Sequence, residues 1–165
     1  MHPTSIHRAL SAALSPVMRL VEAALVALAL AMIVLVFVQV VLRYLTDFSF
    51  YGSEELSRFI FIWFIFLSAA LGLDRGIHFA VDAMLGYMPQ GVRRALEIAS
   101  HLIVLAVLTV LMLRGFDMSV RNWRQLSSAM QVPLTFANAA VPVSCALMVL
   151  ITLRNLFSPA AAKES

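Results

Sequence analysis

Four long runs of apolar residues dominate this sequence and decide which solvent it can fold in. Ala23–Leu42 contains 20 residues, of which only Gln39 is strongly polar. A helix of that length, rising about 1.5 Å per residue, crosses the roughly 30 Å hydrocarbon core of a bilayer. Further runs cover residues 59–73, 98–113 and 132–153. The pattern predicts an all-α integral membrane protein with four transmembrane helices.

The composition excludes a water-soluble domain and several classes of function. Hydrophobic residues make up 62% of the chain and charged residues only 13%, about half the share that a soluble surface needs. The net charge of +3 is carried by arginines that stand singly between apolar runs, which argues against nucleic acid as a partner. The single cysteine, Cys145, excludes a disulfide framework, a CxxC redox pair and a cysteine zinc site within one chain.

We predict one membrane domain over residues 1–165, with spans at about 21–43, 55–75, 95–115 and 132–154. A cleaved signal peptide is the alternative interpretation of the first run, because histidine and arginine precede it. That run is longer than a typical signal-peptide core, which favours a span.

Charged and special residues mark the ends of the spans. Ser53 is a plausible cap for the second helix, with Glu54 and Glu55 in its first turn. Pro142 predicts a kink inside the fourth span. Seven Lys and Arg residues fall on the side of the two termini and five on the other side, so the positive-inside rule places both termini in the cytoplasm.

The segment between the second and third spans, residues 76–88, is too short to cross a bilayer and too apolar for a free loop. It predicts a short amphipathic helix lying flat at the membrane interface. His78 and Asp82, four residues apart, share its polar face with Arg75. They are either solvated charges or a docking pair for another subunit, and a metal site would lack a third ligand.

The first two turns of the second helix carry three charges with two interpretations. Glu54 and Arg58 have the (i, i+4) order that stabilises a helix locally. Glu55 is then left over, either as an ordinary solvated carboxylate or as one half of a salt bridge to a partner.

Aromatic and small residues follow the helices at regular spacing. Phe59, Trp63 and Phe66 recur along the second helix, which suggests lipid on one side and protein on the other. Two stripes of small residues would let two backbones approach closely, and we expect them to pack within the chain, with a foreign helix as the alternative. These stripes are Ala23, Ala27 and Ala31 in the first helix and Ser68, Gly72 and Gly76 in the second.

The polar residues of the spans argue against chemistry or transport by this chain alone. His101 is the only histidine inside a span, so the second axial ligand of a membrane haem is missing. Glu22, Glu97 and Asp117 all fall at span ends, and neither a discontinuous half-helix pair nor a carbonyl-lined filter is visible. We therefore predict an accessory subunit that is not an enzyme and holds no cofactor or metal.

Two blocks of residues carry a family resemblance over roughly residues 20–155. The first block contains Arg43-Tyr44, Glu54-Glu55-Leu56-x-Arg58, Trp63, Phe66-Leu67-x-Ala69-Ala70, Gly76-x-His78, Val81-Asp82 and Pro89. The second runs from Ser128-Ala129-Met130-Gln131-Val132-Pro133 to Val141-Pro142-Val143. In this order they resemble the small permease (Q, or DctQ-like) subunit of tripartite ATP-independent periplasmic (TRAP) transporters. Tyr51 departs from a tryptophan found in many members, and Ser68 from a common glycine.

The resemblance implies a prokaryotic inner-membrane complex that imports organic acids with a sodium gradient. A periplasmic solute-binding protein (P) delivers the substrate, the large M subunit carries the transport domain, and the Q subunit enlarges M's static scaffold in the lipid. On this interpretation eight residues are candidates for partner binding: Glu54, Glu55, Arg58, Trp63, Gly72, Gly76, His78 and Asp82. A self-associating membrane protein and a haem-bearing anchor of a dehydrogenase are the rival hypotheses.

Overall fold

The computed structural model describes residues 3–46, 52–76 and 90–156. Its elements are α1 (Pro3–Thr46), α2 (Ser53–Asp74), α4 (Gln90–Arg121), the 3-10 turn η1 (Asn122–Arg124), α5 (Thr135–Asn138) and α6 (Ala140–Leu156). Within these residues the only β pairing is an isolated bridge between Leu126 and Pro133. Four helical segments are long and apolar enough to cross a membrane, which confirms the predicted fold class.

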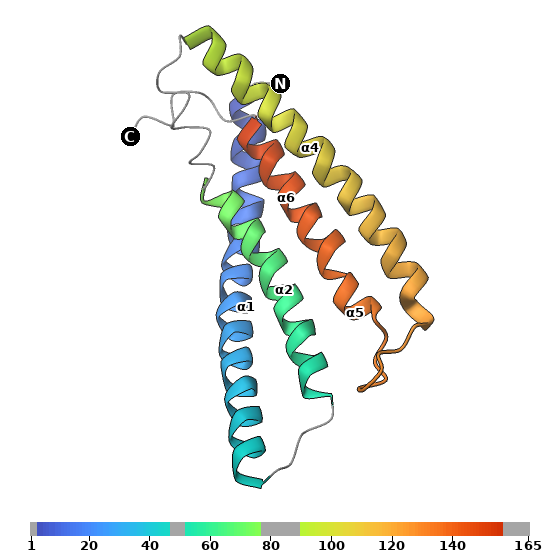
Figure 1. Cartoon of the computed structure of the whole chain (residues 1–165). Coiled ribbons are helices and arrows are strands. Elements are labelled where there is room, and N and C mark those ends of the chain that lie inside the picture. The colour runs from blue at the N-terminus through green and yellow to red at the C-terminus, as the bar shows by residue number, and fades with distance from the viewer. Residues whose placement is uncertain (1–2, 47–51, 77–89, 157–165) are drawn as a thin grey trace.

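The helices pack in an order that differs from their order in the chain. α1 packs against α2, α2 against α6, and α6 against α4, so α6 lies between α2 and α4. Figure 1 shows α1 and α4 on opposite sides of the molecule, with α2 and α6 between them. The helix nearest the C-terminus is therefore the central one.

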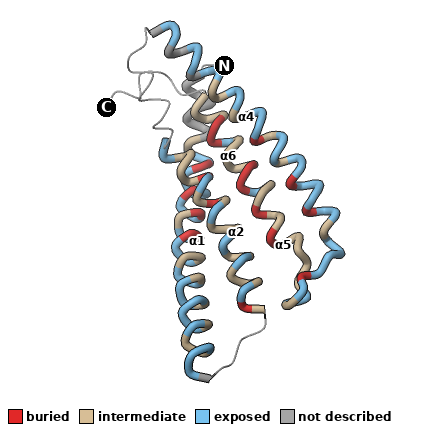
Figure 2. The backbone as a smooth tube through the Cα atoms, viewed as in Figure 1, coloured by how far each residue is buried: buried red, intermediate tan, exposed pale blue. Residues whose placement is uncertain are grey.

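Burial follows this order. In the fourth apolar segment, formed by α5 and α6, 39% of the most apolar stretch is buried, against 6% in the segment of α1 and 11% in those of α2 and α4. Figure 2 shows the same contrast, with buried positions along α6 and pale exposed positions over much of α1 and α4. The helices form an open layer, and their outer faces remain for lipid or for another protein.

A small core joins α1 to the centre of this layer. Its α1 side chains recur at the helical spacing that keeps them on one face. The buried members are Leu14, Met18, Val21 and Leu25 of α1, Leu67 of α2 and Ile151 of α6.

Two helices extend beyond the predicted spans. α1 begins at Pro3 and has 44 residues, about 66 Å of helix and twice the core of a bilayer. α4 continues past residue 115 to Arg121. Hydropathy marks only the stretch that lipid can cover, whereas helices continue wherever residues with good helix propensity follow.

The helix ends obey local chemistry. Pro142 has no N–H to donate to the carbonyl oxygen of Asn138, and the helix is interrupted at Ala139 between α5 and α6, one turn before the position of the predicted kink. Gly76 adopts φ 70 after α2 and donates its N–H to Leu73 O (3.3 Å), a left-handed helix end that favours glycine. The interfacial helix predicted at 76–88 lies, apart from Gly76, outside the described residues.

Candidate partner-binding site

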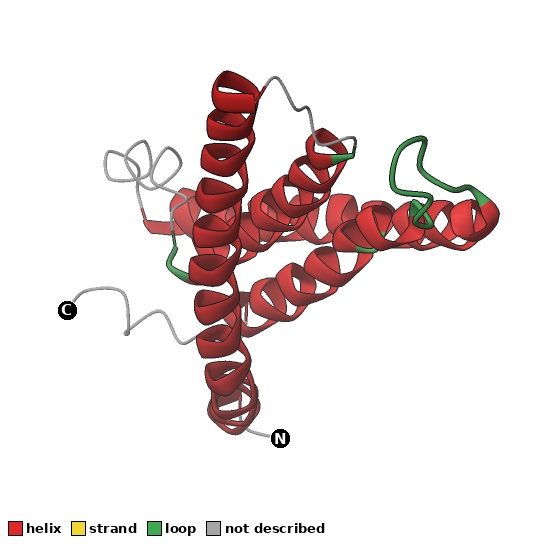
Figure 3. Cartoon of the chain, turned by 90° about the horizontal axis from the view of Figure 1, so that it is seen from below, coloured by secondary structure: helices red, strands yellow, loops and turns green. Residues whose placement is uncertain are grey.

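A compact hairpin loop, residues 125–134, connects the end of α4 to α5. Ser127 N donates to Val132 O (2.9 Å), and Leu134 N donates to Gln125 O (2.9 Å). The buried Ser127 side chain accepts a further bond from Val132 N (3.2 Å). Figures 1 and 3 show this loop beside the first turn of α2.

Glu55 binds the tip of the hairpin loop. Its Oε2 accepts hydrogen bonds from Ala129 N (3.1 Å) and Met130 N (2.9 Å). Gly52, at φ 98, lets the loop approach, since a Cβ there would lie 3.0 Å from Met130 Cγ. The carboxylate that the sequence left as a solvated charge or a partner contact therefore accepts two hydrogen bonds from its own chain, and the two family-like blocks meet here.

Trp63 makes a second bond from α2 to the same region. Its indole Nε1 donates to the backbone oxygen of Phe136 over 2.8 Å. Phe136 belongs to α5, a helix of four residues. In so short a helix few backbone carbonyls accept a hydrogen bond from a backbone N–H of the same helix. Trp63 thus supports the short helix that precedes the break at Ala139.

The other charged residues of the first two turns point outward. Glu54 and Arg58 are both exposed, and in the part of the chain that the structure describes they form no ion pair with each other. The predicted local pairing is therefore wrong, and Glu55 rather than Glu54 is the carboxylate engaged within the chain. Glu54 also lines a groove of about 340 Å³ between α1 and α2, together with Gln39 and Arg43.

These two residues continue into an exposed line along α2, which we call the α2 stripe. Its members follow at intervals of three and four residues, which places them on one helical face. They are Glu54, Arg58, Phe61, Ile65 and Ala69. Gly72 is half-buried and Gly76 is exposed, and both prolong the stripe. Candidates from the sequence thus divide between an inward face, with Glu55 and Trp63, and this outward face.

Two ion pairs join the helices at the end of the layer away from the hairpin loop, and they were not predicted from the sequence. Arg154 Nη1 of α6 lies 2.7 Å from Asp74 Oδ1 of α2, with both side chains largely buried. Asp74 Oδ1 accepts no well-directed hydrogen bond, so this contact is chiefly electrostatic. Arg75 Nη2 donates to Glu22 Oε1 of α1 over 2.7 Å. In the sequence, these ion pairs are indicated only by two adjacent residues of opposite charge, Asp74 and Arg75, at the end of the second span.

A close approach between two helices also lies elsewhere than predicted. A Cβ on Gly115 of α4 would come within 2.9 Å of Val141 Cγ1 and 3.2 Å of Pro142 Cδ in α6. The alanine stripe of α1 is instead exposed, so the expectation that it packs inside the chain is wrong; its members are Ala23, Ala27 and Ala31. In the open layer none of the described helices packs closely against that stripe of α1, so its small side chains are not needed for a contact among them.

The remaining candidates are placed as follows. His78 and Asp82 lie outside the described residues. His101 lines a cavity of only about 20 Å³ with Thr152 and Asn155. Within the described ranges, no group of three or more His, Cys, Asp and Glu side chains could hold a metal ion.

Comparison with known proteins adds an independent finding. Residues 32–162 match the family described as tripartite ATP-independent periplasmic transporters, DctQ component. A TRAP transporter small permease protein of Haemophilus influenzae is 30% identical over 123 residues, which are 71% of this chain and 76% of that protein. The C4-dicarboxylate TRAP transporter small permease protein DctQ of Vibrio cholerae is 28% identical over 87 residues, 53% of this chain and 38% of that one.

A longer relative matches as well. The isethionate TRAP transporter permease protein DctMQ of Oleidesulfovibrio alaskensis is 26% identical over 140 residues. The match covers 80% of this chain and 22% of that protein.

Proposed function

Because this chain belongs to the DctQ component family of tripartite ATP-independent periplasmic transporters, we propose that it is a non-catalytic scaffold that binds the large M permease. It is a small TRAP permease subunit and a multi-pass membrane protein. The observation that carries the scaffold role is the open layer, because three of its four apolar segments bury only 6% or 11% of their most apolar stretch.

The α2 stripe is the surface that we assign to the permease. It combines exposed apolar side chains, Phe61 and Ile65, with two charges, Glu54 and Arg58, at one end. Close helix packing would supply the binding energy, and the charges would fix the register of the two proteins. The long DctMQ relative supports a permease as the partner, since its similarity to this chain covers only 22% of its length. His78 and Asp82, which lie outside the described residues, stay proposed contacts at the membrane interface.

The finer parts of the proposal concern the whole complex. We assign to it the import of an organic acid, coupled to sodium and fed by a periplasmic binding protein. The names of two relatives, which specify C4-dicarboxylate and isethionate, support an organic acid. The charge count supports cytoplasmic termini in a bacterial inner membrane. Transport chemistry is left to the permease, as the family resemblance implies.

Site-specific photocrosslinking tests the docking surface. A photoreactive residue at Ile65 of the α2 stripe should crosslink to a co-expressed permease from the neighbouring gene. The same residue at Val34, which is 59% exposed on α1, is the matched control and should give far less product. Co-purification without a crosslink at Ile65 would refute the α2 stripe as the contact. Failure to co-purify at all, with transport intact after deletion of this chain, would refute the scaffold role itself.

The exposed alanine stripe of α1 supports self-association as the second candidate. Replacing Ala27 by Trp would break such a dimer and lower the mass of the chain measured in detergent. A scaffold for the permease needs no such dimer. A mass that corresponds to one chain, both for the unchanged protein and for the Ala27→Trp variant, would therefore eliminate self-association.

A further inference from the structure

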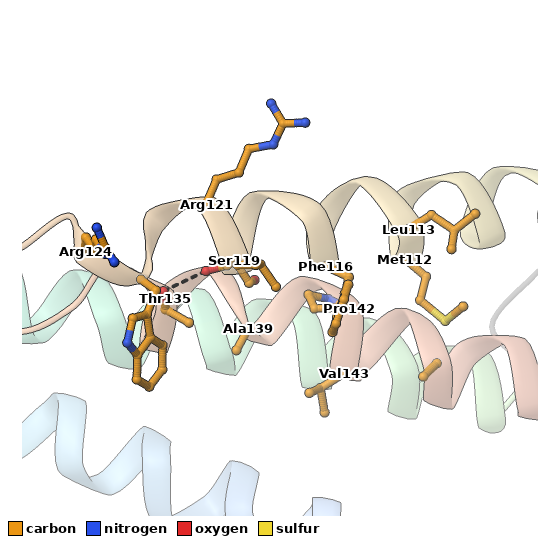
Figure 4. Close-up of a pocket in the computed structure, with 13 residues that line it drawn as sticks. Met112, Leu113, Phe116, Ser119, Arg121, Arg124, Thr135, Ala139, Pro142 and Val143 are labelled. Atoms are coloured by element: carbon orange, nitrogen blue, oxygen red, sulfur yellow. Dashed lines mark hydrogen bonds between the residues drawn. The ribbon is translucent and has the colours of Figure 1, made fainter.

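A groove opens on the flank of α4, away from α1 and α2. It lies between α4, η1 and the α5–α6 segment and encloses about 1060 Å³, at the upper end of the range for ligand pockets. Figure 4 shows its side chains arranged along the two helices. Its lining includes Met112, Phe116, Trp123, Arg124, Thr135 and Val143.

The walls of the groove are apolar because the hydroxyl groups on them are already used. Thr135 Oγ1 donates to Ser119 O over 2.7 Å, the bond drawn in Figure 4. Ser119 Oγ donates in turn to Gly115 O over 2.8 Å. Both donors are thus spent on the backbone of α4, and the long walls offer hydrocarbon to an occupant.

One end of the groove is different. Trp123 is 61% exposed and Arg124 is exposed, and within the described ranges neither the indole N–H nor the guanidinium has a hydrogen-bond or ion-pair partner. Arg121, by contrast, pairs with Asp117 over 3.0 Å, and Figure 4 shows its side chain directed away from Ala139 and Val143. Arg124 is therefore the cation available to an anion at this end.

The length of the groove matches one leaflet of a bilayer. Met112 and Arg124 are twelve positions apart, roughly 18 Å along a helix. Half of the hydrocarbon core measures about 15 Å. Trp and Arg are the residues that anchor proteins at the headgroup level, so the groove runs from that level toward the middle of the membrane.

We propose that this groove is a binding site for a phospholipid. Its phosphate lies against the Arg124 guanidinium and the Trp123 indole N–H, and an acyl chain follows the apolar wall past Phe116 to Met112. Every phospholipid in the leaflet carries an anionic phosphate above hydrocarbon, which is the order of charge and apolar surface found here. The inference does not depend on the proposed scaffold function.

Native mass spectrometry of the purified full-length chain, delipidated and titrated with phosphatidylglycerol, tests the site. Arg124→Gln should weaken lipid binding about tenfold, because a charge-assisted bond to phosphate is lost. Val143→Trp, which fills the groove, should abolish the tightly bound lipid. The matched controls are Arg114→Gln and Val107→Trp, both exposed on α4 outside the groove, and both should bind like the unchanged chain.

Circular dichroism melts of each variant separate lost binding from lost folding. If Arg124→Gln and Val143→Trp fold normally and retain lipid as the unchanged chain does, the proposal is overturned. It is also overturned if a photocrosslinker at Val143 captures the permease while the purified complex retains no lipid.

Discussion

The indole nitrogen of Trp63 lies 2.8 Å from the backbone oxygen of Phe136, 73 positions further along the chain. With the bonds of Glu55 to the hairpin loop, this contact fastens α2 to the segment that enters α6. Two residues that the sequence offers for partner binding therefore also shape the subunit. Substitutions there test the fold, whereas substitutions on the α2 stripe test docking.

We expect Trp63→Phe to lower the free energy of unfolding by about 1 kcal/mol, the usual scale of one hydrogen bond between membrane helices. The phenyl ring keeps part of the indole's packing against the core, while the donor to Phe136 is lost. Thermal unfolding in detergent measures the effect. Phe61→Leu, on the exposed face of the same helix, is the control, and an equal loss in that variant would contradict the assignment.

Glu55→Ala should speed hydrogen exchange at the amides of Ala129 and Met130, because both lose their acceptor. Mass spectrometry of the peptide that covers residues 125–134 measures this rate. Glu54→Ala removes an exposed carboxylate one position away and should leave the peptide unchanged. Similar exchange in the two variants would show that Glu55 does not hold the loop.

Asp74→Ala should destabilise the chain by about 2 kcal/mol, since it leaves the largely buried Arg154 cation without its carboxylate partner and with Asn155 Oδ1 as a neutral acceptor. Adding Arg154→Leu should restore part of the loss, which a double-mutant cycle of thermal unfolding would detect. Glu22→Ala breaks the more exposed pair with Arg75 and should cost less than about 1 kcal/mol. Additive effects of the two changes at Asp74 and Arg154 would count against their coupling.

Gly115→Ala should destabilise the packing of α4 on α6 by about 1–3 kcal/mol, the usual range for an overpacked contact. The new methyl group would meet Val141 at 2.9 Å and the rigid ring of Pro142 at 3.2 Å. Gly91→Ala is the matched control, because a Cβ there has nothing within 4 Å. Higher stability in both variants would mean that helix propensity outweighs the contact.

The fold class could be predicted from sequence because lipid imposes a simple rule on it. A helix that crosses a bilayer needs about 20 apolar residues, and the runs at Ala23–Leu42 and residues 132–153 satisfy that rule directly. The helix interruption at Ala139 was equally predictable from Pro142, since the missing N–H acts within one turn. The length of α1 was not, because helix continues from Pro3 through residues that hydropathy does not mark.

The site was predictable only in part because facing neighbours are set by tertiary packing. Glu55 and Glu54 are adjacent and chemically identical, and only the position of the hairpin loop shows which one is engaged. Gly115 and Ser119 form only a two-membered pair of small residues at a spacing of four, shorter than the predicted stripes, yet Gly115 forms a close contact between α4 and α6. The order α1, α2, α6, α4 decides both outcomes, and no local pattern encodes it.

The open arrangement of the helices has a consequence for the living cell. Copies made in excess of the permease would leave wide apolar helix faces without a protein partner. We expect membrane proteases to degrade such unassembled copies quickly. The cellular amount of this subunit should then follow the amount of the permease, without dedicated genetic control. The reason is that an unassembled copy buries too little of its own surface to be stable.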